Sequence, residues 1–65
     1  MNRIRTLRKI GSTSQKELAN AIGVSQPLVS YWEREKRTPS MVNAQKLADF
    51  FGVEIKDIFV EKTAQ

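Results

Sequence analysis

Hydrophobic residues recur along this chain at intervals of three and four, which is the spacing of one face of a helix. The first two apolar stripes are Ile4 with Leu7, and Leu18 with Ala19 and Ile22. The later stripes are Leu28, Val29 and Trp32; Met41, Ala44, Leu47, Ala48 and Phe51; and Val53, Ile55 and Ile58. The pattern predicts an all-α protein, a compact bundle of five short helices in which these stripes face inward.

Local signals mark the ends of the second and third helices. Ser14 with Glu17 three residues later is a capping box, and Gly23 suits the left-handed conformation that ends a helix. Ser25 caps the next helix, and Pro27 falls in its first turn, where its missing N–H is not needed. The short turn excludes parallel packing, so we expect the two helices to cross steeply as a helix-turn-helix.

The other helices carry similar stop and start signals. The first helix ends near Gly11. Pro39 prevents the third helix from continuing, and Ser40 can cap a fourth, which Gly52 closes. We therefore predict one domain over residues 1–60 and a frayed polar tail over 61–65.

Length and composition limit the possible chemistry. A chain of 65 residues forms one domain whose core is near the lower limit for independent stability. Without cysteine or histidine, disulfides are excluded and no metal site is expected. No apolar run reaches membrane-spanning length and no signal peptide is evident, so we expect a cytoplasmic protein that makes no membrane contact.

Positive charge is distributed unevenly. The net charge is +4, and the first sixteen residues contain no acid. Four cations, Arg3, Arg5, Arg8 and Lys9, lie close together in this segment, and a second cluster, Arg34, Lys36 and Arg37, follows the third helix. Two successive helices each begin with a glutamine, and a cluster of cations follows the second of them. This pattern is typical of a protein that reads DNA base edges.

The sequence resembles the phage Cro/repressor-type (xenobiotic-response-element, XRE) helix-turn-helix family over roughly Ile4 to Phe59. The matching positions are Gln15, Leu18-Ala19, Gly23-Val24-Ser25-Gln26, Val29-Ser30, Trp32-Glu33, Lys36-Arg37, Pro39-Ser40, Leu47-Ala48-Asp49, Phe51-Gly52-Val53 and Ile58-Phe59. Together they are specific, and the resemblance implies a repressor-like bundle that binds double-stranded DNA.

Two positions depart from the family pattern. Glu35 stands where the family usually has glycine, at the end of the recognition helix, and a glutamate with positive φ would be strained there. Thr13 stands where a hydrophobic residue usually precedes the second helix. Neither departure changes the predicted fold.

Base-contacting residues are expected on the recognition helix, about residues 25–34. The amide of Gln26 offers one donor and one acceptor, which match the major-groove edge of adenine. The resemblance implies that five positions face bases: Ser25, Gln26, Pro27, Ser30 and Tyr31. The alternatives are that Gln26 is an idle exposed glutamine and that Tyr31 packs on the surface beside Trp32.

Phosphate contacts are expected around this helix. Gln15 opens the second helix, whose N-terminus favours anions, and in the family this amide binds a phosphate and often braces the first glutamine of the recognition helix. The resemblance implies phosphate contacts for Gln15 and Ser40, and Arg34, Lys36, Arg37 and Thr38 are expected to make them because they lie beside the recognition helix. Ser14 completes the expected set. The alternatives are a plain helix-start glutamine at Gln15, a solvated cationic loop, and a Ser40 that acts only as a helix cap.

Three residues are expected to be structural. Trp32 shares a face with Leu28 and Val29, so we place it in the core. Glu33 resembles the family's acid that pairs with an arginine of the first helix, here Arg8. Arg8 is therefore expected to form an ion pair and not to contact DNA.

A homodimer is expected through the C-terminal part of the chain. Phe50 lies off the inward stripe of the fourth helix, and Phe59 and Val60 end the fifth helix with nothing after them to cover them. Ile55 joins this surface or belongs to the core. Large apolar groups left exposed on a small domain often mark contact sites.

The predicted function is a sequence-specific DNA-binding transcriptional regulator, a repressor that occupies a palindromic operator as a dimer. The alternative is an antitoxin or another protein-interaction module whose DNA binding is autoregulatory. An enzyme is not expected, because the chain has no histidine, no cysteine and no phosphate-binding glycine loop. Neither a cofactor nor a small-molecule ligand is evident.

Overall fold

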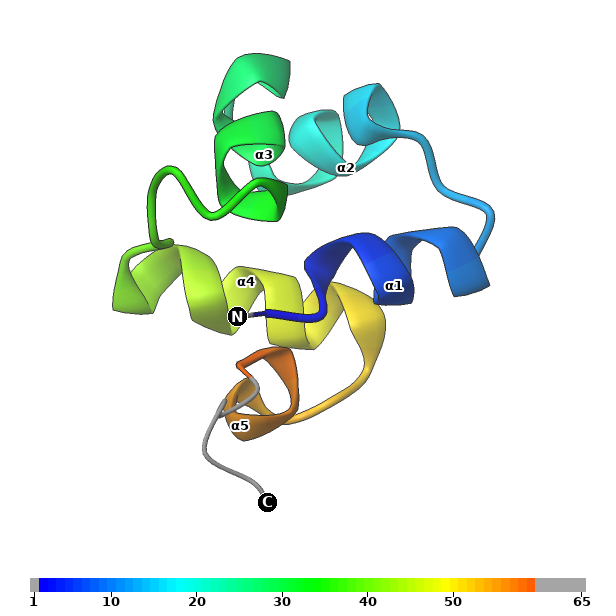
Figure 1. Cartoon of the computed structure of the whole chain (residues 1–65). Coiled ribbons are helices and arrows are strands. Elements are labelled where there is room, and N and C mark those ends of the chain that lie inside the picture. The colour runs from blue at the N-terminus through cyan, green and yellow to red at the C-terminus, as the bar shows by residue number, and fades with distance from the viewer. Residues whose placement is uncertain (1, 60–65) are drawn as a thin grey trace.

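The computed structural model of the chain describes residues 2–59 and contains five helices within them (Figure 1). They are α1 (Ile4–Ile10), α2 (Gln15–Ile22), α3 (Gln26–Glu33), α4 (Met41–Phe51) and α5 (Ile55–Ile58). The all-α prediction is confirmed. Between residues 2 and 59, extended pairing is limited to an isolated antiparallel bridge between Asn2 and Phe59. The tail expected over residues 61–65 lies outside the described residues.

The helices are arranged around α1 and α4. In Figure 1, α2 and α3 lie together at one end of the molecule and α5 lies at the other, with α1 and α4 between them. α2 packs against α3 and α4, α1 packs against the same two helices, and α5 packs against α4. The α2–turn–α3 unit therefore packs on α1 and α4 with its inner side, and its outer surface faces solvent.

The predicted apolar stripes meet in one core. Its largest fully buried side chains are Trp32, Ile4, Leu18, Leu47, Ile58 and Val29. Every helix contributes at least one of them, so burial of this core holds the five short helices in a single arrangement. Trp32, which is 1% exposed, lies in the core as predicted.

Serine caps begin the three longest helices. The hydroxyls of Ser14, Ser25 and Ser40 accept hydrogen bonds from backbone N–H groups three residues later, at 3.0, 3.3 and 3.2 Å. The N–H of Ser14 also donates to Glu17 Oε1 at 2.8 Å, which completes the predicted capping box. The predicted starts of these helices are confirmed.

One motif ends the four longer helices. In each, a backbone N–H bonds to the carbonyl five residues earlier: Thr13 to Arg8, Val24 to Ala19, Lys36 to Tyr31 and Val53 to Ala48, at 2.8–3.0 Å. The residue before each donor is left-handed, and these residues are Ser12 (φ 55°), Gly23 (φ 86°), Glu35 (φ 60°) and Gly52 (φ 71°). This is the Schellman motif, in which glycine is usual at the left-handed position. Two of the four positions therefore hold residues with a side chain.

Two packing predictions are wrong. Met41 is 72% exposed, and its neighbour Val42 is 67% exposed, because the first turn of α4 extends beyond the packed core. Val53 precedes α5 and does not belong to it, since the Schellman hydrogen bond places this residue in the turn after α4. Val53 still packs against the core, as does Ile55.

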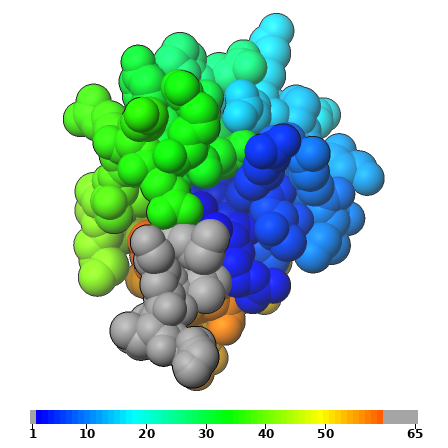
Figure 2. Space-filling view, viewed as in Figure 1, coloured from blue at the N-terminus to red at the C-terminus, as the bar shows by residue number. Residues whose placement is uncertain are grey.

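The first residues are tied to two distant parts of the chain. Asn2 Nδ2 donates to the backbone carbonyl of Trp32 at 2.9 Å, and the Arg3 N–H donates to the carbonyl of Ile58 at 2.7 Å. Asn2 Oδ1 accepts the Ile4 N–H at 3.1 Å, which satisfies one donor at the start of α1. Figure 2 shows the N-terminal segment (blue) beside the end of α3 and the loop that follows it (green).

Candidate nucleic-acid interface

The start of α3 presents the residues that were predicted to read bases. Ser25 caps the helix, and Gln26 and Pro27 occupy its first two positions with exposed side chains. Within residues 2–59 the Gln26 side chain makes no hydrogen bond, so both its donor and its acceptor are available. Because Val29 and Trp32 are buried on the inner side of α3, the helix is held firmly while its N-terminal end stays accessible.

The last turn of α3 carries an aromatic–cation pair. Tyr31 is 40% exposed, and the guanidinium carbon of Arg34 lies 5.3 Å from its ring centroid. This distance is within the range of a cation–π interaction, which orders both side chains. Ser30, also predicted to face bases, is half-buried. Tyr31 and Arg34 therefore form one exposed unit.

Gln15 opens α2 and is held by α3. Its Nε2 donates to Glu33 Oε1 at 3.0 Å. The resemblance suggested that this amide braces Gln26, but in the structure its partner is Glu33. The hydrogen bond fixes Gln15 at an N-terminus where unpaired backbone N–H groups already favour an anion.

Arg8 and Glu33 form the expected ion pair. Arg8 Nε lies 2.6 Å from Glu33 Oε2, and Arg8 Nη2 lies 3.1 Å from Oε1, so the contact is bidentate. Arg8 Nη1 also donates to the carbonyl of Thr13 at 2.9 Å. The side chains are only 11% and 4% exposed, which removes Arg8 from the set of available phosphate contacts.

The ion pair shifts both titrations. Burial raises the pKa of Glu33, but hydrogen bonds from Arg8 and Gln15 and the charges of Arg8 and Arg5 outweigh it, so the pKa lies below its ordinary value. The hydrogen bond to Glu33 raises the pKa of Arg8. Both groups therefore stay charged at neutral pH.

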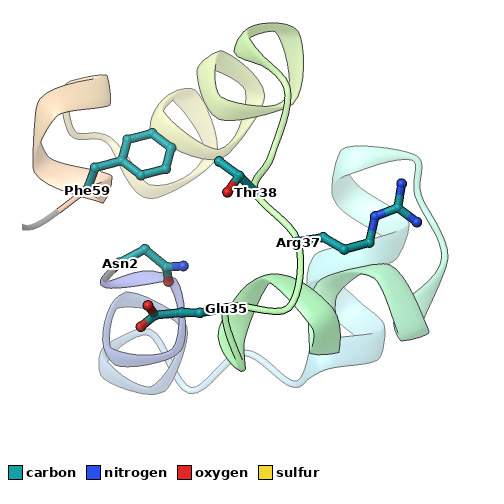
Figure 3. Close-up of a pocket in the computed structure, with 5 residues that line it drawn as sticks. All are labelled: Asn2, Glu35, Arg37, Thr38 and Phe59. Atoms are coloured by element: carbon teal, nitrogen blue, oxygen red, sulfur yellow. The ribbon is translucent and has the colours of Figure 1, made fainter.

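The loop after α3 carries exposed residues predicted to contact phosphates, Lys36, Arg37 and Thr38. A hollow of about 140 Å³ beside this loop is lined by Asn2, Glu35, Arg37, Thr38 and Phe59. It is smaller than typical ligand pockets of about 300–1,000 Å³. In Figure 3 the Arg37 side chain extends away from the other four, so its guanidinium is directed elsewhere.

Ser14 and Ser40 were also predicted to bind phosphates, and both are exposed helix caps. Each hydroxyl oxygen accepts a backbone N–H, which leaves its own O–H as a donor. The two serines lie at the starts of α2 and α4, where the helix dipole favours negative charge. A phosphate contact is therefore compatible with their capping role.

The four residues predicted for a dimer contact differ in accessibility. Phe50 is 44% exposed, and its ring lies 5.3 Å from that of Phe51 in an edge-on arrangement. Ile55 and Phe59 are half-buried and pack against the core, so less of Phe59 is accessible than expected. The N-terminal segment lies beside it, since Asn2 forms a bridge with Phe59. Val60 lies outside the described residues.

Sequence reasoning missed two contacts that support the interface. The hydrogen bond from Gln15 to Glu33 joins residues eighteen positions apart, and the one from Asn2 to the Trp32 carbonyl spans thirty. An asparagine two residues before a helix is a known signal for local capping. Neither long-range partner follows from such a local signal.

Between residues 2 and 59 no group of three or more His, Cys, Asp or Glu side chains could hold a metal ion. Across the same span, no helix is long and apolar enough to cross a membrane.

The chain is similar to known proteins over most of its length. The family described as Helix-turn-helix matches residues 4–58. An uncharacterized HTH-type transcriptional regulator of Methanocaldococcus jannaschii is 39% identical over 59 residues, which cover 91% of this chain and 89% of the relative. The cryptic phage CTXphi transcriptional repressor RstR of Vibrio cholerae is 35% identical over 57 residues, or 88% of this chain and 51% of RstR.

A solved structure has the same fold. The N-terminal DNA binding domain of SinR from Bacillus subtilis superposes with a TM-score of 0.82 at 32% identity. The match covers 95% of this chain and 91% of that domain.

Proposed function

The chain belongs to the helix-turn-helix family of DNA-binding transcriptional regulators, which are not enzymes, and from this premise we propose that it is a repressor. It binds a palindromic operator as a homodimer, with α3 in the major groove. A role as repressor is supported by similarity to the phage repressor RstR. The partner is double-stranded DNA, since the matched part of SinR is its DNA binding domain.

The exposed amide of Gln26 at the capped start of α3 carries this proposal. Gln26 is the first residue of the helix, and its side-chain amide makes no hydrogen bond within residues 2–59. The buried side chains of Val29 and Trp32 hold the helix in place. A glutamine in this position can make a bidentate contact with adenine. We propose that Ser25, Pro27, Ser30 and Tyr31 complete the base contacts.

Hydrogen-bond donors and cations around the start and end of α3 would contact the phosphates of the DNA backbone. We propose phosphate contacts for Ser14, Gln15, Arg34, Lys36, Arg37, Thr38 and Ser40. Such contacts position a protein without reading sequence, and the cations among them make affinity fall with added salt.

We propose that two copies pair because a single recognition helix contacts only a short stretch of DNA. A single recognition helix covers few base pairs, which gives too little discrimination among the competing sites of a genome. Two copies related by a two-fold axis place their helices in successive major grooves, roughly 34 Å apart. We propose that they meet through Phe50, Ile55, Phe59 and Val60, with the exposed ring of Phe50 as the main contact.

A pair of substitutions tests the DNA-binding roles. Duplexes are first selected from a randomised pool, and dissociation constants are then measured at several salt concentrations. Gln26→Ala should weaken binding to the selected site by about 1–3 kcal/mol and relax the preference at one base pair of each half-site. Lys36→Ala should weaken all sequences alike and lower the salt slope by about one.

The two variants serve as controls for each other. Both change one exposed side chain, and neither is part of the core. Equal losses of specific and non-specific binding in both variants would contradict the assignment. A chain that selects no duplex would contradict the proposed function as a whole.

A further inference from the structure

We propose that Glu33 is a positioning residue for DNA binding: it holds the side-chain amide of Gln15 so that the second N–H of this amide faces a DNA phosphate. Glu33 does not touch DNA in this arrangement and acts through Gln15. The inference rests on the proposed function, because it assumes that the start of α2 meets the DNA backbone.

The donors at the start of α2 support this role. A glutamine amide nitrogen carries two N–H groups, and Gln15 uses one of them for Glu33 Oε1 at 3.0 Å. The other has no acceptor within residues 2–59. The backbone N–H groups of Gln15 and Lys16 are also unpaired there, as expected for the first residues of a helix. The side chain therefore adds a fixed donor to an existing anion-binding position.

The carboxylate of Glu33 would repel a phosphate if its charge were not balanced. Arg8 balances it through two contacts, of 2.6 Å to Oε2 and 3.1 Å to Oε1. Oε1 is the same oxygen that accepts from Gln15. Arg8 thus allows an acidic residue to orient a phosphate-binding amide, and it links α1 to the DNA-facing end of α2.

The benefit of this hydrogen bond is that the side chain is ordered before DNA arrives. A free glutamine loses rotamer freedom when it binds, and the cost of immobilising one such side chain corresponds to a loss in affinity of roughly two- to tenfold. Removing the carboxylate should therefore weaken DNA binding by about this factor, provided that Gln15 is present.

A double-mutant cycle tests this dependence. Binding of the full chain to a mixed-sequence duplex of about 20 base pairs, two turns of DNA, is measured for wild type, Gln15→Ala, Glu33→Ala and the double variant. Alanine is used because a glutamine at position 33 would still offer an oxygen to Gln15. Glu33→Ala should bind about two- to tenfold more weakly than wild type. In the Gln15→Ala background the same substitution should have little further effect.

Stability must be separated from positioning, because Glu33→Ala leaves Arg8 without its anion and destabilises the fold. Ile4→Ala, a core change of similar expected cost at a fully buried site, serves as a destabilised control whose DNA affinity should stay unchanged. Glu33→Asp is the second variant. It keeps the charge beside Arg8, but its side chain is one methylene shorter and should lose the contact with Gln15.

A measurement on the free protein gives a readout that stability alone does not move. In wild type, NMR should show slower exchange for the side-chain amide protons of Gln15 than for those of Gln26, which have no partner within residues 2–59. In Glu33→Asp, the exchange of Gln15 should approach that of Gln26.

Each outcome decides the question. Equal exchange for Gln15 and Gln26 in wild type, or an undiminished effect of Glu33→Ala in the Gln15→Ala background, would overturn the positioning role and leave the proposed function intact. Failure of the wild-type chain to bind any duplex would overturn both. A non-additive cycle together with slow exchange of Gln15 is the expected result.

Discussion

Glu35 adopts a left-handed backbone conformation at the end of the proposed recognition helix, with φ 60°. A residue with a Cβ pays roughly 1–2 kcal/mol in this conformation, and glycine does not. Glu35→Gly should therefore raise the free energy of unfolding by roughly 0.4–1 kcal/mol, because relief of the strain exceeds the added freedom of the unfolded chain. Thermal and denaturant unfolding measure the change.

Glu35→Ala is the matched control for this change. It removes the same carboxylate but keeps the Cβ and hence the strain, so we expect it to be less stable than Glu35→Gly by about 1 kcal/mol. Equal stability of the two variants would show that the strain at the left-handed position does not exceed the freedom that glycine adds to the unfolded chain.

The ionised form of Glu33 couples stability to pH. Its folded-state pKa lies below the value of about 4.3 for an unfolded chain, so its contribution is present above that pH and is lost as pH falls through the folded-state value. Wild type should lose stability below about pH 4.3, and Glu33→Gln should have a shallower dependence there. At neutral pH this variant should be less stable by about 3 kcal/mol, since Arg8 loses its buried partner.

Urea unfolding between pH 3 and 7 measures both effects. Parallel pH profiles for wild type and Glu33→Gln would contradict the assigned titration, whatever their separation at neutral pH.

At the scale of the helices, the backbone conformation requires glycine at the end of α2 but not at the end of α1. Gly11 has φ −87°, and an added Cβ would meet only ordinary contacts of 3.6–3.8 Å. Gly23 has φ 86°, where a side chain is strained. Gly11→Ala should therefore stabilise the protein by about 0.4–1 kcal/mol, and Gly23→Ala should destabilise it by about 1–2 kcal/mol.

Melting curves of the two alanine variants test this contrast directly, because the substitution is chemically the same. Stabilisation by Gly23→Ala, or destabilisation by Gly11→Ala, would mean that the ends of these helices differ from the structure.

The elements could be predicted where their signals are local. Serine caps, the capping box and Gly23 lie within a few residues of the helix ends that they define, so the sequence alone was sufficient. The left-handed Ser12 was missed because the neighbouring Gly11 is the usual residue for that role. The exposure of Met41 was also missed, since periodicity does not show where the core ends.

At the scale of the whole molecule, the site was less predictable than the fold. The Arg8–Glu33 pair was expected from the family resemblance, yet the third member of this network, Gln15, was given a different partner. Contacts between residues far apart in sequence depend on how α2 crosses α3, and no local pattern fixes that geometry. The same reason explains the unexpected tie between Asn2 and Trp32.

The proposed dimer is tested by sedimentation at high protein concentration, alone and with a selected palindromic duplex. We expect two chains per duplex for wild type. Phe50→Glu should reduce this to one, because a charge replaces the exposed ring. Ile10→Glu is the matched control: Ile10 is 73% exposed but lies on α1, outside the proposed contact. A strict monomer that binds its site one to one would exclude the dimer.

The tie between the first and last described residues has a consequence for folding kinetics. The bridge between Asn2 and Phe59 closes a loop of about 57 residues, and the part of its entropic cost that depends on loop length is roughly 3.6 kcal/mol. The helix-turn-helix needs only local contacts and can form earlier. A contact that forms after the transition state slows unfolding without speeding folding. We therefore expect the tie at the start of the chain to form late and to slow unfolding of the proposed recognition helix, to whose last turn Asn2 is bonded.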